Sequence, residues 1–388
     1  MKQNLQFKEY YLDRKDFNVT KRESNIELLR IIAMIMIVGS HLSGHGVQHQ
    51  LVAEEALQIW KNGLFFNKIF CCFLNPGGAI GVAIFFLISG YFQINKNKIS
   101  FHKVVLESIF YGWIISIVWI VLALFGIIND SSNVSFLDIC KQLFNPVLGD
   151  AWWFVSVYII VMLNSLLLNK LINLMNDRQF VLFLLVFWLI EYCFMYFDGA
   201  IYFNIFRGVF YYCVGAYMNR IGMLKIKNTI NKYILSVIFI FTWIMGACLF
   251  YFSNSLSINA DSISNKLIAL LCRTIFIGMV VPICSIAIFN VFLNLKIKTN
   301  IIINKLASTV FSAYLITDSA VIRMYLWHNL IHVDDYWYGK ECFPVFAMGC
   351  IMLIIFICFL VDSIRIKWIE PVYIVKYNNL KNNVLNIV

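Results

Sequence analysis

The sequence predicts an all-α integral membrane protein with about ten transmembrane helices and both termini in the cytoplasm. Of its 388 residues, 61% are hydrophobic and 13% are charged, with a mean hydropathy of +0.77, whereas soluble domains carry about 25% charged residues. Ten apolar stretches approach the length of about 20 residues that crosses a bilayer. Lysine and arginine gather in alternate connections between these stretches, which gives the spans a direction.

The predicted spans follow one another through short connections, and no hydrophilic block is large enough for a second soluble domain. Residues 1–25 are expected to form a cytoplasmic tail, because their first twenty residues lack the apolar core and cleavage site of a signal peptide. Residues 364–388 are expected to form a second cytoplasmic tail. The membrane domain between them, 26–363, contains spans predicted at 26–43, 78–94, 104–127, 151–174, 179–197, 200–219, 233–253, 267–293, 306–327 and 344–363.

The basic residues orient these spans. With the N-terminus inside, four arginines fall within spans and 22 of the 31 Lys and Arg residues fall on the cytoplasmic side, as the positive-inside rule expects. The outer connections hold the other five, Lys61, Lys68, Lys141, Lys266 and Lys340. Anionic lipid at the cytoplasmic surface accounts for the net charge of +10 without a nucleic-acid partner. Trp152, Trp153 and Trp327 lie near predicted outer span ends, where an aromatic belt is expected.

No metal centre is predicted. The eleven cysteines are scattered through apolar runs without zinc-ligand spacing, so we interpret them as small buried hydrophobic residues. His328 and His332 have the i, i+4 spacing of metal ligands on a helix and precede Asp334 and Asp335. We take this pair as a chance spacing in an outer loop.

The first span carries two ionisable side chains on one face. Arg30 and His41 are eleven positions apart, so on a helix they lie about 20° from one another around the axis and about 16 Å apart along it. Ionisable groups inside a membrane usually face a cavity or a partner and mark function. Histidine accepts a proton from a hydroxyl near neutral pH, which makes His41 a candidate general base. Two structural alternatives remain: Arg30 extending to the inner surface, and His41 hydrogen-bonding between helices.

Polar residues around this span are given structural interpretations. Ser24-x-x-Glu27 matches a capping box, so Glu27 is predicted to cap the first helix. His45 and His49 are predicted to be solvated in the outer loop.

Polar and small residues in the later spans are interpreted in the same way. Asp318 is predicted in the middle of a span, paired with His41, Arg323 or Arg273. Ser89 is expected to bond its own helix backbone, and Glu107 to pair with a neighbouring helix. Gly77 and Gly81 indicate close helix packing rather than a phosphate loop, because no GK[ST] ending follows them.

An arginine, ten residues and a histidine on the first of about ten membrane helices resembles the membrane-bound acyltransferase-3 family, whose members include O-acetyltransferases of bacterial surface polysaccharides and other glycans. The resemblance continues in family order along nearly the whole chain. The stretches that carry it are "GGAIGVAIFFLISGYF" (77–92), "AWWFVSVYIIVML" (151–163) with Trp153, "RGVFYYCVGAYM" (207–218) and "ASTVFSAYLITDSAVI" (307–322).

The chain departs from the family pattern at three places. The Arg-x-x-Arg pair that often enters the third helix is replaced by Val105 and Ser108. The histidine that often follows Tyr-Leu-Ile is replaced by Thr317, with Asp318 after it. The acid of the first helix, commonly aspartate, is Glu27. These changes bear on the donor contacts and on the identity of the acceptor.

The resemblance implies an acyltransferase of a bacterial plasma membrane, with cytoplasmic acetyl-CoA as the donor substrate and no resident cofactor. The implied acceptor is a hydroxyl of a surface or capsular polysaccharide, or of its lipid-linked precursor. Lys98 and Lys103, with Arg30, are expected to hold the donor's phosphates at a basic cytoplasmic mouth. His41 would deprotonate the acceptor or carry the acyl group, while Arg30 would orient the donor or stabilise negative charge. Glu27, Ser89, Trp153 and Asp318 are candidate supporting residues.

Two other classes of protein compete with this interpretation. A transporter or flippase of sugars or lipid-linked glycans would also need polar residues in its spans, distributed along a path and accompanied by discontinuous helices in repeated halves. A non-enzymatic membrane assembly subunit would tolerate loss of His41. The sequence leaves the oligomeric state open, with a homo-oligomer as one alternative. The polar residues of this sequence concentrate on the first span and no internal repeat is visible, which favours the enzyme.

Overall fold

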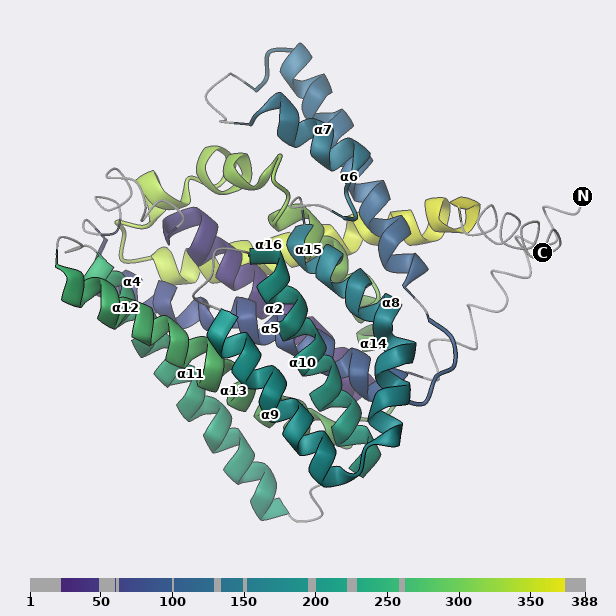
Figure 1. Ribbon diagram of the computed structural model, residues 1–388. Helices are drawn as coiled ribbons and strands as arrows, with labels where there is room; N and C mark the ends of the chain where they lie inside the picture. Colours follow the sequence, from purple (N-terminus) through teal and green to yellow (C-terminus); the bar gives the residue numbers. More distant parts are fainter. Residues whose placement is uncertain are drawn as a thin grey trace, which may run out of the picture.

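The computed structural model describes residues 22–48, 60, 63–99, 101–128, 134–148, 152–194, 200–221, 229–257 and 262–373, and within these ranges the chain is helical and contains no strand. The all-α prediction is therefore confirmed for the described residues. Figure 1 shows a layered bundle in which α2 (Ser24–Ser43) and α5 (Pro76–Gln93) lie near the centre. The other principal helices are α4 (Phe65–Leu74), α6 (His102–Leu124), α7 (Phe136–Phe144), α8 (Trp153–Leu174), α9 (Asp177–Phe194), α10 (Ala200–Ile221), α11 (Thr229–Ser257), α12 (Ile263–Ile275), α13 (Val281–Leu293), α14 (Ile301–Ala307), α15 (Phe311–Thr317) and α16 (Phe343–Ile364).

Seven helical segments of the described chain are long and apolar enough to cross a membrane, rather than the ten predicted. They are Ser24–Val47, Phe65–Gln93, His102–Leu124, Trp153–Leu174, Lys232–Leu256, Ile263–Leu293 and Phe343–Tyr373. The spans predicted at 179–197 and 200–219 correspond to the helices α9 and α10. The last of the seven segments extends ten residues beyond the predicted end of the membrane domain at 363, through the π-helical turn η7 (Arg365–Ile369).

The predicted continuous span 306–327 is wrong in form. The chain makes two short helices there, α14 and α15, and then the π-helical turn η5 (Tyr325–Leu330). Asp318 therefore follows the C-terminal end of α15 and does not lie in the middle of a helix. A helix end leaves backbone groups unpaired and places side chains at varied angles, which suits a polar site better than a regular span does.

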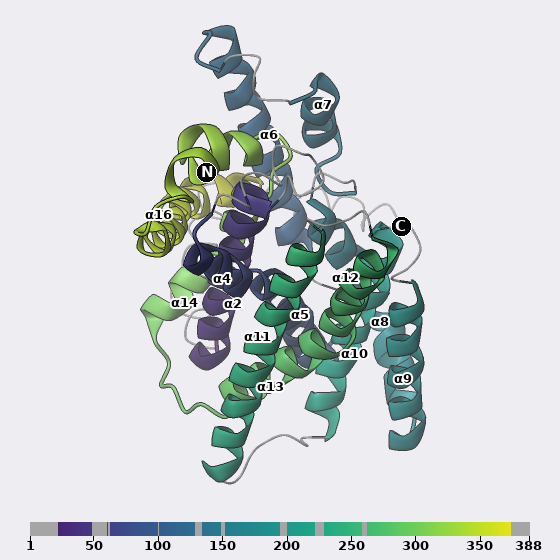
Figure 2. The ribbon, with the colours of Figure 1, turned by 90° about the vertical axis from the view of Figure 1, so that its left-hand side faces the viewer.

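The close approach of α5 to α2 depends on glycine, as predicted. A Cβ atom on Gly77 would lie 2.5 Å from the Met36 carbonyl oxygen, and one on Gly81 would lie 2.6 Å from Cγ1 of Ile37. No other residue allows this separation, since the backbones themselves are nearly in contact. Figure 2 shows α2 and α5 running through the interior of the bundle, with α6 and α7 projecting beyond it.

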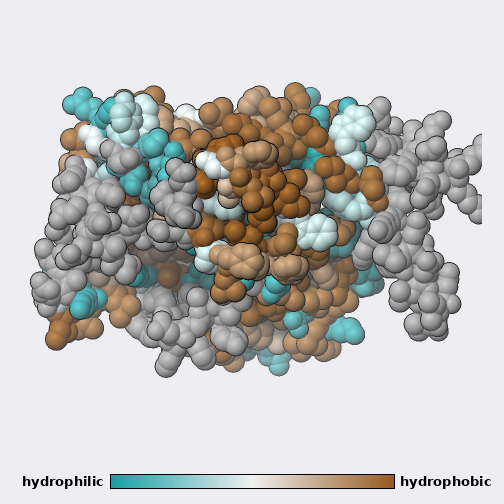
Figure 3. Space-filling view, turned by 90° about the horizontal axis from the view of Figure 1, so that it is seen from above, coloured by the Kyte–Doolittle hydropathy of each residue, from teal (hydrophilic) through white to brown (hydrophobic). Residues whose placement is uncertain are grey.

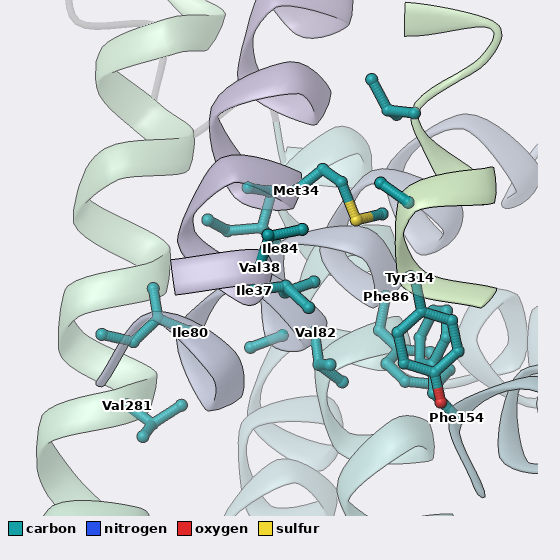
Figure 4. Close-up of a cluster of buried hydrophobic side chains, with 14 of the residues drawn as sticks. Met34, Ile37, Val38, Ile80, Val82, Ile84, Phe86, Phe154, Val281 and Tyr314 are labelled. Carbon is teal, nitrogen blue, oxygen red and sulfur yellow. The ribbon is translucent and has the colours of Figure 1, made fainter. Parts of the chain in front are cut away.

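Buried apolar side chains fill the space between α2, α5 and their neighbours. Figure 4 shows Met34, Ile37 and Val38 of α2 beside Ile80 and Val82 of α5, all of them buried. The same view places Tyr314 of α15 against Phe86 and Phe154, which extends the cluster towards the later half of the chain.

Much of the outer surface is apolar, as expected for side chains that face lipid. Large hydrophobic residues are exposed along α6, α11 and α16, and Figure 3 shows such side chains across the middle of one face. Trp152 and Trp327, however, are fully buried and do not belong to an interfacial belt. The prediction of an interfacial position is therefore wrong for both residues. In Trp152, the indole turns inward and donates a hydrogen bond to the Leu315 carbonyl at 3.1 Å.

One strongly charged cluster is buried where α6 meets the end of α16. Arg365 bonds Asp362 through Nε, and its guanidinium also lies 3.3 Å from Glu107 and 3.6 Å from Glu370. Tyr111 donates to Asp362 at 3.0 Å. Glu107 thus pairs with a neighbouring helix, as predicted, and a carboxylate-rich cluster fastens α16 to α6.

Candidate active site

The predicted stripe of α2 faces α14 and α15. At its N-terminal end, Ser24 donates to Asn304 of α14 at 2.8 Å. Arg30, six residues further along α2, lines a cavity together with Ala307 and Phe311. His41, three turns beyond Arg30, contacts Thr317 of α15 at 2.8 Å. The expectation that Arg30 and His41 share one face is confirmed, and that face meets the broken late span.

The contact with Thr317 determines which nitrogen of neutral His41 is basic. The Thr317 hydroxyl donates to the Ala313 carbonyl at 2.6 Å. A hydroxyl has a single hydrogen, so Thr317 can only accept from His41, and Nδ1 of His41 carries the hydrogen at the 2.8 Å contact. The lone pair then lies on Nε2, which is the arrangement that a general base requires. His41 therefore bonds to a neighbouring helix and still keeps one nitrogen for chemistry.

His45 is not solvated as predicted, because it lies beside His41 and pairs with Asp318. The two imidazole rings have centroids 5.2 Å apart, and Nε2 of His45 donates to the Asp318 carboxylate at 3.1 Å. Asp318 is buried and also lies 4.0 Å from the Arg323 guanidinium. Arg323 was among the predicted partners of Asp318, whereas His45 was not. The available signal was the i, i+4 spacing from His41, which puts His45 near the same helix face. His49 lies outside the described residues.

A π-helical turn, η1 (Gly44–Gln48), carries the chain away from α2 and contains His45. A second histidine anchors this turn. His328 of η5 donates from Nε2 to the His45 carbonyl at 2.9 Å, and its Nδ1 lies 2.6 Å from a carboxyl oxygen of Asp334. These two contacts fasten η1 to the later part of the chain. The residue four positions after His328, His332, has a left-handed φ of 55° and is exposed, which breaks the helical ligand geometry that the spacing suggested.

Glu27 does not cap α2. The residue before the helix is Glu23, and no side chain caps the first turn. Ser24 instead uses its hydroxyl to donate to Asn304 and to accept from the Asn300 amide at 2.8 Å. Glu27 is left to pair with Arg30, 3.3 Å away, and with Arg22, 3.5 Å away. The capping box was a wrong prediction because a tertiary partner took the serine hydroxyl.

A cavity of about 160 Å³ extends inward from Arg30. Phe85, Phe154, Tyr158 and Phe311 supply aromatic walls, and Ser89 also lines it. Ser89 donates to the Phe85 carbonyl at 2.8 Å, which confirms the expected backbone bond.

Two aromatic residues connect this cavity to the base. The ring of Phe154 lies 5.4 Å from that of Tyr314, which in turn lies 5.9 Å from the His41 ring. A series of ring contacts therefore links the cavity at Arg30 to His41.

The remaining predicted residues are Trp153, Lys103 and Lys98. Trp153 is partly buried at the start of α8, with its ring 6.3 Å from that of Phe154. Lys103 is half-exposed, 4.0 Å from Glu370, and precedes Val104, which lines the cavity. Lys98 is exposed on the segment between α5 and α6. The structure thus puts Lys103 near the cavity, while Lys98 lies on the surface.

Within the described residues, His41, His45 and Asp318 form a group with the composition of a metal site, since one ligand atom from each lies within 4.8 Å of the others. Hydrogen bonds already join His45 to Asp318 and His41 to Thr317. A chain of histidine, histidine and carboxylate can accept, hold and orient a proton, and this is the chemistry that the bonds present here favour.

A family model matches most of the chain. The acyltransferase domain family, Acyl_transf_3, matches residues 23–363, which include all of the residues placed around His41. Searches among curated proteins and among solved structures found no match. Because the match covers most of the 388 residues, the chain is a membrane acyltransferase belonging to the acyltransferase-3 family.

Proposed function

We propose that the protein transfers an acetyl group from cytoplasmic acetyl-CoA to a hydroxyl of a bacterial surface or capsular polysaccharide, or of its lipid-linked precursor. The observation that carries this proposal is His41, whose Nδ1 hydrogen is committed to Thr317 and whose Nε2 is left basic. The protein would act as a multi-pass enzyme of the bacterial plasma membrane, with both termini in the cytoplasm.

His41 supplies the proton transfers of this reaction. Its Nε2 takes the proton of the acceptor hydroxyl as the oxygen attacks the thioester carbonyl. The tetrahedral intermediate then collapses, the C–S bond breaks, and the imidazolium returns the proton to the departing CoA thiolate. A two-step route, in which Nε2 itself attacks the thioester and forms an acyl-imidazole, uses the same lone pair.

Arg30 is assigned to the donor. It lies about 16 Å from His41 along α2, too far to stabilise charge on a carbonyl that reacts at the imidazole. Its side chain remains 32% exposed although Glu27 lies 3.3 Å away, so the guanidinium can bind a phosphate of CoA by charge-assisted hydrogen bonds. The pantetheine arm would then extend through the aromatic cavity, with Lys98 and Lys103 adding positive charge at the mouth.

The supporting residues act through His41 and Arg30. Glu27 orients Arg30, and Asp318 holds His45 beside His41. Trp153 and Ser89 shape the donor cavity and its wall. None of these roles requires a metal ion or a resident cofactor.

The test is acetylation of surface glycan in cells that express His41→Gln or Arg30→Ala, followed by assay of the purified full-length proteins with acetyl-CoA. Loss of a general base lowers the rate by about 10² to 10⁴-fold, so His41→Gln should lower kcat by that factor. Arg30→Ala should raise KM for acetyl-CoA more than it lowers kcat.

His332→Asn is the matched control, because this histidine is exposed and asparagine tolerates its left-handed backbone. Its activity should equal that of the unsubstituted protein. Full acetylation by well-expressed His41→Gln protein would disprove the mechanism. If the protein used another acyl-CoA in preference to acetyl-CoA, only the proposed identity of the donor would change.

A further inference from the structure

Two buried hydrogen-bond donors close to Asp318, the hydroxyl of Tyr314 and Nε of Arg323, have no hydrogen-bond partner among the described residues. Acyl transfer needs such donors, because negative charge develops on the carbonyl oxygen in the tetrahedral intermediate. Arg30, about 16 Å from His41 along α2, is too far away to supply one. We propose that Tyr314 and Arg323 form the oxyanion hole of this enzyme. The inference rests on the proposed function and assigns two residues that it leaves unused.

Tyr314 lies beside the base. It is on α15, three residues before Thr317, and its ring centroid is 5.9 Å from that of His41. The residue is only 2% exposed. Its hydroxyl lies near the Asp318 carboxylate, which accepts from His45, yet it makes no hydrogen bond itself in the described chain. A buried hydroxyl without a partner is costly, so its presence here indicates a use that arises only when substrate is bound.

Tyr314 also stands between His41 and the donor cavity. Its ring is 5.4 Å from that of Phe154 (Figure 4) and 6.0 Å from that of Phe311, and both of these residues line the cavity. A general base contacts the acceptor hydroxyl at about 2.6–3.2 Å, and an oxyanion donor lies about 2.7–3.1 Å from the oxyanion. A thioester that advances from the cavity can therefore bond Tyr314 through its carbonyl oxygen while the acceptor hydroxyl contacts His41.

Arg323 supplies positive charge at the same place. Its NH1 atom lies 4.0 Å from Asp318, which is too long for a hydrogen bond. Both His41 and Tyr314 are within electrostatic range of the guanidinium. Its side chain is 32% exposed, so the guanidinium is open to an entering group. A cation fixed beside the reacting atoms stabilises the oxyanion more strongly in this interior than it would in water.

The two residues take part in the step without being consumed. As the acceptor oxygen forms its bond to the acyl carbon, the π electrons of the carbonyl move onto its oxygen. Tyr314 donates a hydrogen bond to that oxygen and keeps its proton. When the C=O bond forms again, the C–S bond breaks and the CoA thiolate takes the proton that His41 removed from the acceptor.

The test is Tyr314→Phe, which removes one oxygen atom and no hydrogen bond of the described chain. The purified full-length protein is assayed with acetyl-CoA and surface glycan isolated from cells that express His41→Gln. Its kcat should be lower by about 10² to 10³-fold, the effect of losing one oxyanion donor, while KM for acetyl-CoA is unchanged. Its Tm in detergent should be unchanged or higher, because a buried hydroxyl without a partner has been removed.

Tyr338→Phe is the matched control. Its hydroxyl is likewise buried without a partner among the described residues, but its ring packs against Phe343 and not against His41. Its kcat should equal that of the unsubstituted protein. Arg323→Gln tests the second donor and should lower kcat at least tenfold, again without a change in KM for acetyl-CoA.

Three results would overturn the proposal. The first is the same kcat in Tyr314→Phe and Tyr338→Phe. The second is a lower Tm in Tyr314→Phe, because the hydroxyl would then serve the fold. The third is a shift in the pH dependence of kcat/KM in that variant, because the hydroxyl would then act on the base through Asp318. An unchanged kcat in Arg323→Gln would remove the guanidinium from the oxyanion hole.

The outcome for the oxyanion hole can be separated from that for the proposed function. If Tyr314→Phe is fully active while His41→Gln is inactive, only the oxyanion hole is disproved. If His41→Gln protein acetylates normally, the proposed function is disproved whatever the activity of Tyr314→Phe.

Discussion

The hydroxyl of Thr317 lies where the family resemblance led us to expect a histidine, and it contacts another histidine, His41, at 2.8 Å. Because its hydrogen is donated to Ala313, it accepts from Nδ1 of His41. A histidine replaced by a hydroxyl would ordinarily suggest a lost function. Here the smaller side chain orients the base, and the neighbouring Asp318 acquires its own histidine, His45.

Thr317→Val should therefore lower kcat about tenfold, the value of one hydrogen bond, because His41 is then free to place its hydrogen on either nitrogen. Thr317→Ser keeps the hydroxyl and should retain most of the rate. Steady-state kinetics with acetyl-CoA would separate the two, and KM for the donor should be unchanged in both. Equal losses in Thr317→Ser and Thr317→Val would contradict this role.

At the residue scale, the sequence predicted the chemistry of α2 better than its contacts. Arg30 and His41 were identifiable because charge inside an apolar span is rare and helical geometry places both on one face. Glu27 was predicted to cap the helix from a local sequence pattern, and His45 was predicted to be solvated from its position in a loop. Both predictions were wrong because these residues pair with side chains that only the folded chain brings close. Ser24 bonds a residue 280 positions away, and no local rule anticipates that bond.

At the scale of helices, α2 and α5 are held together by contacts between backbone and small residues. Hydropathy and glycine spacing predicted this pair, because glycine in an apolar helix has few other uses. The break between α14 and α15 was not predictable in the same way. The segment 306–327 contains neither proline nor glycine, and its main local signal is the polar run Thr317-Asp318-Ser319, which we interpreted as lying within a span.

Gly81→Ala should destabilise the protein, because its new Cβ would lie 2.6 Å from Ile37 and 2.7 Å from the Ala33 carbonyl oxygen. The matched control is Gly349→Ala in α16, where a Cβ meets nothing within 4 Å. Thermal unfolding in detergent should show a Tm several degrees lower for Gly81→Ala and no decrease for Gly349→Ala. A similar Tm for both variants would mean that α2 can move away from α5 at little cost.

The buried cluster around Arg365 gives a second prediction at this scale. Arg365→Met leaves Glu107, Asp362 and Glu370 buried without their central cation, and breaking a buried ion pair costs about 3–5 kcal/mol. Lys367→Met, two residues away on an exposed side chain, is the control. The midpoint of unfolding should fall strongly for the first variant only. An unchanged midpoint would show that the three acids are neutral or hydrated.

For the whole molecule, the orientation in the membrane is a prediction from the distribution of basic residues. The predicted ten spans and the seven apolar segments differ because α9 carries three charged residues, because α10 is less apolar and because the late span is broken. Composition is enough to predict a helical membrane protein. The exact path of the chain also depends on interior polar contacts, which composition does not encode.

Accessibility to a membrane-impermeant maleimide tests this orientation in intact cells. Cys342 is exposed just before α16 and is expected outside, so the peptide that contains it should be labelled, and Cys342→Ser should remove the label from that peptide. Lys98→Cys, introduced into the Cys342→Ser protein, should be labelled only after the cells are permeabilised. Labelling of position 98 in intact cells would reverse the proposed topology.

The π-helical turn that follows α2 also affects how the chain tolerates change in length. Residues 44–48 contain one more residue per hydrogen-bonded loop than an α-helix does, so a regular helix is available to the chain by losing a single residue. Deleting Gly44 would keep every functional side chain in the protein yet move His45 one position back along the helix, a turn of about 100° about the axis. His45 would leave Asp318 while His41 stayed in place. Deletion of a single codon is thus enough to separate the two histidines. A change in the length of this turn would therefore alter activity while every catalytic residue is kept.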